Sequence, residues 1–168
     1  MGDWQQYIDQ IIHQLDYDTN EWIRENVCSE AALYGTDGSC WAFSPGFPEL
    51  KQYDFEVEQE DGSMRSIAID ELQCAIKATE NVRNPTDAGI RLGNEKYMLT
   101  TVQPAGGSDV AQLARRGGGG AAIAKTATGI VIAFFKKDGV MSDNKPQNIT
   151  DTGDQVGAMA TFLKEQGF

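Results

Sequence analysis

Bulky apolar residues recur at helical spacing at both ends of this chain. They are Trp4, Tyr7, Ile8, Ile11, Ile12 and Leu15 near the start, and Met159, Phe162, Leu163 and Phe168 near the end. This period predicts an amphipathic helix at each end of the fold. Because chain ends usually fray, aromatic rings placed there indicate two docked helices and suggest a shared aromatic surface that is open to a partner.

The limits of the two helices follow from capping residues. Asp3 is a suitable N-cap for the first helix, which we expect to run to about Leu15. Thr152 with Gln155 three residues later forms a capping-box pattern, so we expect the last helix to begin there and to end near Gly167.

Between the two helices, short strand-like runs alternate with turns rich in glycine, proline and asparagine. The predicted strands are residues 28–34, 40–44, 54–58, 66–70, 89–92, 96–103, 110–115, 121–125 and 130–136. The turn-like strings TDGS at 36–39 and EDGS at 60–63 predict two hairpins, the second strongly acidic. A short helix is predicted over residues 71–80. The fold class is therefore α+β with a mostly antiparallel sheet.

Two stretches are less regular. Residues 16–26 are polar, and Trp22 with Ile23 indicates either a second helical turn or a loop anchored by these two side chains; we favour the anchored loop. Residues 47–50 are compatible with the start of a short helix.

Composition narrows the class of protein. At 168 residues the chain fits one domain, 1–168, with a core that needs no disulfide or metal. The net charge of -11 opposes general adhesion to nucleic acid, so we expect no nucleic-acid partner, although a local basic patch can still bind anions. Three cysteines, Cys28, Cys40 and Cys74, lack CxxC spacing and accompany a single histidine, so we expect no metal and no cofactor. We find no apolar run of membrane length and no signal-peptide pattern, and a reducing cytosol is the simplest compartment.

One motif imitates a nucleotide site. Residues 119–126 read G-x-x-x-x-A-K-T, one residue away from the phosphate-binding P-loop. A P-loop needs a helix that begins at the lysine, whereas Thr128-Gly129 followed by an apolar run predicts a hairpin. His13 lies in a predicted helix with no nucleophile or acid to group with it, so we expect no enzyme.

Four local strings carry a resemblance to a known family. They are WQQY at 4–7, DGSCWA at 37–42, GNEKYM at 93–98 and ATFLKEQG at 160–167. In this order and spacing the chain resembles the profilins, small actin-monomer-binding proteins. The resemblance covers nearly the whole chain, with insertions near 16–26 and 54–70, and an acidic hairpin insertion of the second kind is associated with protist profilins.

The resemblance implies both fold and function. The fold would be a central antiparallel β-sheet with the N- and C-terminal helices packed on one face and smaller helices on the other. The function would be regulation of actin polymerisation by a noncatalytic, monomeric protein of the cytoplasm and cytoskeleton that binds monomeric actin and proline-rich proteins such as formins. The alternative is a proline-motif adaptor with weak or lost actin binding.

The resemblance also assigns a proline-binding surface. The matching positions are Trp4, Tyr7, Trp41, Phe162 and Phe168. A polyproline II ligand is already extended, so flat rings bind it at little ordering cost. Phe162 and Phe168 stand where polar rings are common in the family, which implies weaker or altered proline binding. The competing interpretation is that these rings are helix-packing core.

A basic segment and the acidic hairpin complete the implied sites. The implied actin-binding residues are Lys96, Arg115, Arg116, Lys125, Asp154, Gln155, Glu56 and Glu58. Arg115, Arg116 and Lys125 are also implied to bind phosphoinositide head groups, because guanidinium groups hold acidic oxygens bidentately. The alternative for the basic residues is a solvated face without a ligand. The alternative for the acidic hairpin is an edge hairpin whose charges prevent aggregation.

Overall fold

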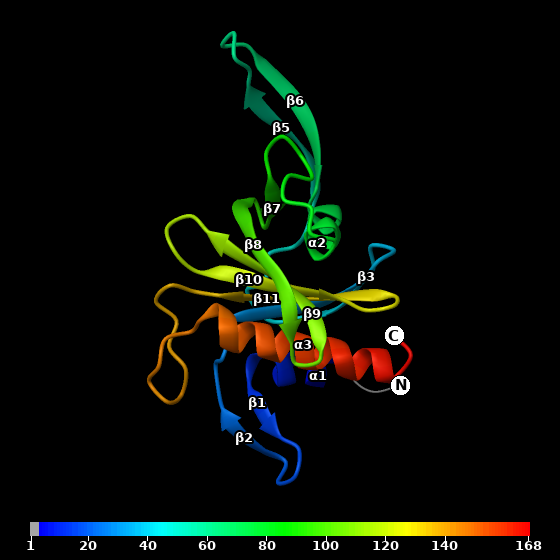
Figure 1. Ribbon diagram of the computed structural model, residues 1–168, viewed down its shortest axis with the longest axis vertical. Helices are drawn as coiled ribbons and strands as arrows, with labels where there is room; N and C mark the ends of the chain where they lie inside the picture. The colour runs from blue at the N-terminus through cyan, green and yellow to red at the C-terminus, as the bar shows by residue number, and fades with distance from the viewer. Residues whose placement is uncertain (1–3) are drawn as a thin grey trace.

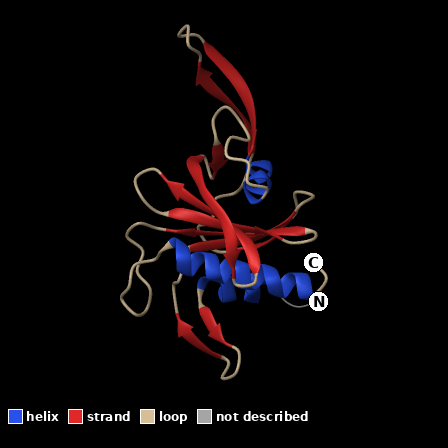
Figure 2. Ribbon diagram, in the orientation of Figure 1, coloured by secondary structure: helices blue, strands red, loops and turns tan. Residues whose placement is uncertain are grey.

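A seven-stranded antiparallel sheet forms the centre of the molecule in the computed structural model, which describes residues 4–168. The strand order is β4-β3-β11-β10-β9-β8-β7. The strands are β3 (Glu30–Gly35), β4 (Cys40–Phe43), β7 (Ile90–Leu92), β8 (Glu95–Ala105), β9 (Ser108–Arg115), β10 (Gly120–Lys125) and β11 (Gly129–Phe135). Helices α1 (Trp4–Ile12) and α3 (Ile149–Glu165) cover one face, and α2 (Glu71–Thr79) lies against the other (Figure 1; Figure 2). The family-derived expectation for the fold is confirmed, with a single small helix on the second face of the described chain.

Alternation along the central strands divides the core between the two faces. In β11, Ile130 and Ile132 pack in the cluster under α2, while Val131 and Ala133 pack under α1 and α3. All four are fully buried, as expected for a strand covered on both faces. Gly157 lets α3 lie directly on the turn between β8 and β9, because a side chain there would overlap the carbonyl group of Ala105.

Two further hairpins stand outside the central sheet. The N-terminal hairpin consists of β1 (Gln14–Asp16) and β2 (Glu21–Arg24), and the acidic arm consists of β5 (Gln52–Glu58) and β6 (Met64–Asp70). They project from opposite ends of the long axis of the molecule, the arm beyond α2 and β7 and the N-terminal hairpin beyond the two terminal helices (Figure 1).

The predicted strands and the short helix are confirmed, including the β10–β11 hairpin that replaces the apparent P-loop. The N-terminal region differs from the expectation. Helix α1 ends at Ile12, and Leu15 lies in β1. Residues 14–24 form a hairpin with a register shift between Gln14 and Leu15, which replaces the anchored loop that the sequence favours over 16–26. The proposed cap Asp3 lies outside the described residues. Residues 47–50 form no helix, and Phe47 is buried against Tyr34 and Phe134 instead.

The start of α3 is also corrected. The helix begins one turn earlier than predicted, with Asn148 as N-cap: its Oδ1 accepts from the backbone N–H of Asp151 at 2.8 Å. Thr152 is fully buried inside the first turns. Both residues are good caps and lie four positions apart, so the local sequence offered two solutions that differ by about one turn.

Candidate functional site: an aromatic floor and a basic end

Five aromatic rings from three separate parts of the chain meet beside the terminal helices. The centroid of Trp4 lies 4.8 Å from that of Trp41, 5.6 Å from Tyr7 and 5.0 Å from Phe168, and Tyr7 lies 5.4 Å from Phe162. Each ring is half-buried, so the cluster packs on the core and still presents a surface. We call these five residues the aromatic floor.

The sequence explains why the rings converge. Trp4 and Tyr7 are three residues apart on α1, so they share one face, beside the buried Ile8 and Ile11. Trp41 occupies an irregularity in the pairing of β3 with β4 and packs on the same side of the sheet as Ala42.

The last ring is held in place although it is the last residue of the chain. The backbone N–H of Phe168 donates to the carbonyl of Leu163 at 2.9 Å, and its own main-chain oxygen accepts from the N–H of Thr128 at 2.7 Å and from the hydroxyl of Thr128 at 3.0 Å. Phe168 is therefore fixed against the β10–β11 turn.

Comparison with known proteins identifies the fold. The profilin family model matches residues 2–168. The chain belongs to the profilin family. A profilin of Tetrahymena pyriformis is 29% identical over 157 residues, covering 89% of this chain and 97% of the relative. Profilins are actin-binding proteins without enzymatic activity.

Solved profilin structures share the architecture at low sequence identity. Acanthamoeba castellanii profilin IA has a TM-score of 0.58 at 21% identity, covering 98% of this chain and 99% of that one. Mouse profilin IIa, in complex with a double repeat from the FH1 domain of mDia1, has a TM-score of 0.58 at 17% identity, covering 99% of this chain and 100% of that one. Within residues 4–168, no helix is both long and apolar enough to cross a membrane.

The predicted basic residues do not form one patch. Arg115 ends β9, and Ala114 pairs with Gly120 at the start of β10. Lys125 ends β10, five residues further on, which is about 17 Å along an extended strand. Lys125 therefore lies at the opposite end of the sheet, beside the β10–β11 turn and on the face of α2, with its Nζ 3.9 Å from Glu80 Oε1.

Lys136 and Lys137, which are not among the residues predicted to bind, lie near Arg115 where Lys125 is expected. A cavity of about 460 Å³ is lined by Arg115, Lys136 and Lys137 together with Gly117, Gly118, Phe135 and Asp138. Gly120 pairs with Phe135 across β10 and β11, which brings Lys136 and Lys137 to the end of β9. We call Arg115, Lys136 and Lys137 the basic pocket. The sequence shows a local excess of positive charge in this segment. Which of its basic residues line one pocket can be seen only from the register of β9, β10 and β11.

The remaining residues predicted to bind actin differ in whether their side chains are exposed to a partner. Lys96 is exposed and precedes Tyr97, which pairs with Arg115, so Lys96 lies near the basic pocket; Asp154 is exposed on α3. Gln155 is already engaged: its Nε2 donates to the carbonyl groups of Gln10, Ile11 and His13 at 3.0–3.1 Å. Gln155 therefore satisfies carbonyl groups at the end of α1, and its amide N–H groups point inward.

The acidic arm is attached to the body through a buried carboxylate. Glu71 is 1% exposed and accepts three hydrogen bonds: from the backbone N–H of Lys51 at 3.1 Å, from the hydroxyl of Tyr53 at 2.9 Å and from the backbone N–H of Asn94 at 2.8 Å. Arg91 donates to Tyr53 and stacks over Phe55 at 4.2 Å. The exposed Glu56 and Glu58 are thus presented on an arm whose base is fixed.

Proposed function

We propose that this profilin-family protein binds monomeric actin, regulates its polymerisation in the cytoplasm, and binds proline-rich ligands such as formin segments. The observation that carries the proline-binding part is the aromatic floor, whose rings pack against one another and are half-exposed. Such a surface suits a polyproline II ligand, because ligand and receptor both lose little conformational freedom on binding. The FH1 complex of the mouse relative supports the same ligand class.

The floor retains polar groups despite Phe162 and Phe168. Trp4 and Trp41 carry indole N–H donors, and Tyr7 carries a hydroxyl. These can bond the carbonyl groups of a proline tract, which has no N–H of its own to offer. We therefore expect proline binding that is driven mainly by ring contact, with fewer hydrogen bonds than in relatives that have polar rings at the last two positions.

Tryptophan fluorescence during titration with decaproline tests this part. The chain has three tryptophans, and Trp22 lies outside the floor, so Trp22→Ala is the matched control for Trp4→Ala. We expect Trp22→Ala to retain binding and Trp4→Ala to lose it, by at least tenfold, because Trp4 contacts three other rings of the floor. A native protein whose fluorescence does not respond to decaproline would refute the proposed proline site.

The proposed actin surface lies toward the other end of the central strands. It comprises Lys96, Arg115, Arg116 and Asp154, extended by Glu56 and Glu58 of the acidic arm. Because the floor adjoins the β10–β11 turn and Arg115 lies at the other end of β10, the two ligands can bind together. Assembly of pyrene-labelled actin, with and without decaproline, distinguishes this function from the adaptor alternative, in which assembly is unaffected.

We also propose that phosphoinositide head groups bind at the basic pocket, with Arg116 beside it. Arg115 and Lys137 line one cavity with Lys136, which also pairs with Glu30 at 3.2 Å. Guanidinium and ammonium groups of this kind bind phosphorylated head groups even with Asp138 in the lining. Cosedimentation with vesicles that contain phosphatidylinositol bisphosphate tests it. We expect Lys136→Ala/Lys137→Ala to lower binding severalfold and Lys125→Ala to change it little. Equal effects of the two variants would refute the pocket.

A further inference from the structure

A second, mostly apolar pocket lies on the opposite side of β4 from the aromatic floor. Its volume is about 430 Å³, and it is lined by Tyr34, Cys40, Phe43, Phe47 and Leu50, with the exposed Glu49 supplying a charge. This volume lies within the range of sites that bind small ligands, roughly 300–1,000 Å³. We call it the Phe43 pocket.

The aromatic floor and the Phe43 pocket lie on opposite faces of the sheet, with β4 between them. Trp41 and Ala42 pack on the side of α1 and α3, whereas Tyr34 and Phe47 belong to the core on the side of α2. Cys40 pairs with Tyr34 and lines the pocket, although it is the sequence neighbour of Trp41. The surface on one side of the strand and the cavity on the other are thus separated by β4 alone.

The edge between the two sites is open. β4 is the first strand of the sheet and pairs only with β3, so no strand of the described chain covers its other edge. At that edge Gln5 of α1, next to Trp4, donates to the carbonyl of Phe43 at 3.3 Å. The ring of Phe43 is 55% exposed. The floor and the pocket therefore adjoin through Phe43, and a peptide can pass from one to the other around the strand.

We infer that the Phe43 pocket receives an apolar side chain that flanks the proline tract bound on the aromatic floor. This inference rests on the proposed proline binding and adds a specificity site to it. An extended chain spans at most about 3.3–3.6 Å per residue, so a flexible spacer of roughly four residues reaches about 13 Å, enough to round one strand. Glu49 predicts a preference for a basic over an acidic residue next to the apolar one.

The partner is therefore a proline tract with an aromatic or aliphatic residue a few positions beyond it. Uniform proline contacts give affinity but little discrimination, since every proline presents the same ring. An added apolar pocket distinguishes one proline-rich protein from another and fixes the position of the tract on the floor.

Calorimetric titration with three peptides tests the inference. They are decaproline, decaproline followed by four glycine or serine residues and a phenylalanine, and the same extended peptide with alanine in place of the phenylalanine. We expect the phenylalanine peptide to bind about tenfold more tightly than the other two, as expected for burial of one apolar side chain after ordering costs. Equal affinity of all three peptides, with the phenylalanine placed at any spacer length from two to six, overturns the inference while leaving the proposed proline site intact.

Two pocket variants locate the effect. Phe43→Ala removes an exposed wall of the pocket, and Cys40→Phe fills it from an exposed strand position. We expect both to abolish the tenfold gain and to keep the affinity for decaproline within about twofold, whereas Trp4→Ala lowers the affinity for every peptide. A gain that survives both variants overturns the inference. If native protein self-associates in sedimentation experiments and Phe43→Ala prevents it, the occupant is a second copy of the chain and the inference is also wrong.

Discussion

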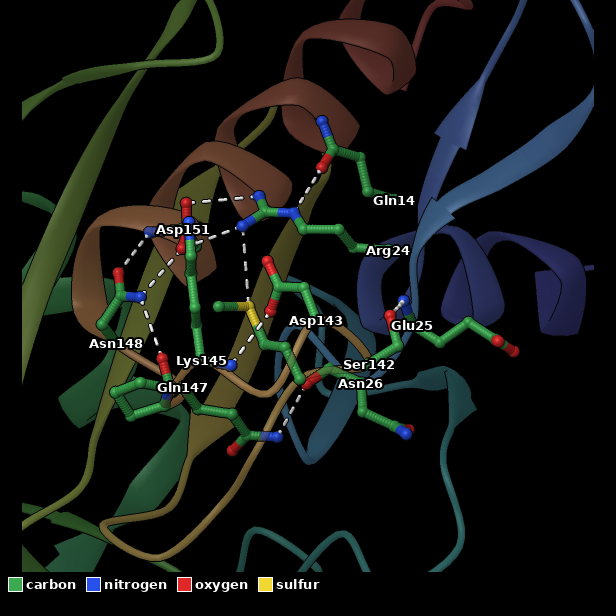
Figure 3. Close-up of polar contacts among 12 residues, drawn as sticks. Gln14, Arg24, Glu25, Asn26, Ser142, Asp143, Lys145, Gln147, Asn148 and Asp151 are labelled. Atoms are coloured by element: carbon green, nitrogen blue, oxygen red, sulfur yellow. Dashed lines mark hydrogen bonds and ion pairs between the residues drawn. The ribbon is translucent and has the colours of Figure 1, made fainter.

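The two projecting hairpins are attached to the body in physically different ways. The acidic arm has two seven-residue strands in continuous register, and its base is joined to the body through the buried carboxylate of Glu71. The N-terminal hairpin has strands of three and four residues, and its attachment is partly exposed: Arg24 donates two hydrogen bonds to Asp151, at 3.2 and 3.3 Å (Figure 3). Within the hairpin, Arg24 also donates to Gln14 at 2.9 Å.

The second attachment is a network of many weak contacts. Glu25 and Ser142 exchange hydrogen bonds in both directions, and Gln147 donates to the carbonyl of Asn26 at 2.9 Å (Figure 3). Isolated two-stranded hairpins are marginal in water, so both need such anchors. The comparison teaches that the arm has one buried anchor, Glu71, supported by partly exposed contacts of Arg91 and by the Arg65–Asp87 ion pair. The anchors of the N-terminal hairpin are partly exposed.

Removal of the buried carboxylate should have the largest effect. Glu71→Ala leaves two backbone N–H groups and the Tyr53 hydroxyl without their acceptor, and we expect a loss of roughly 3 kcal/mol in the free energy of unfolding. Glu71→Gln should lose less, since one side-chain acceptor remains. Urea denaturation measures both, with Glu56→Ala on the exposed face of the same arm as the control. If Glu71→Ala is no worse than Glu56→Ala, the arm is not held as described.

Shortening the arm should have the next largest effect, and it should change only the affinity for actin. Because a fixed base presents Glu56 and Glu58 at a defined position, deletion of residues 56–66 should weaken binding to monomeric actin about tenfold, or about 1.4 kcal/mol. The matched control shortens the N-terminal hairpin by replacing residues 17–20 with a two-residue turn, which should leave actin affinity unchanged. Unchanged actin affinity in the arm deletion would mean that its charges serve only to prevent edge-to-edge aggregation.

The difference between the hairpins also shows what sequence can predict. The arm alternates acidic and apolar residues around an Asp-Gly turn, a strong local signal. The strands of the N-terminal hairpin are too short to show a period, and their pairing depends on Arg24 reaching Asp151, 127 positions away. Long-range contacts of this kind leave no local pattern, which is why a loop was expected there.

The same reasoning applies to the functional sites. The members of the aromatic floor could be predicted because helical spacing and the family strings identify them one by one. Lys125 was grouped with Arg115 because they are close in sequence, but the antiparallel return of β10 carries them to opposite ends of the strand. Gln155 was placed on the actin surface by position, and only the packing of α3 against α1 shows that its side chain is turned inward.

Loss of the exposed ion pair should have the smallest effect, and one that depends on pH. The hydrogen bonds from Arg24 hold the pKa of Asp151 below its usual value. This contribution is fully present above the ordinary aspartate pKa of about 4 and is lost as the pH falls through the depressed pKa of the folded protein. Arg24→Gln should therefore cost about 1 kcal/mol at pH 7, because the pair is partly exposed, and less as the solution becomes strongly acidic.

Hydrogen exchange separates the ion pair from the rest of the network. In Arg24→Gln, amides of β1 and β2 should exchange faster at pH 7, while those of the acidic arm are unchanged. Lys145→Gln removes a charge that also lowers the pKa of Asp151 but forms no ion pair with it, so this variant should accelerate exchange less than Arg24→Gln (Figure 3). Should Arg24→Gln accelerate exchange in both hairpins, the two attachments are coupled through the sheet, and the contrast between one buried anchor and many exposed ones no longer holds.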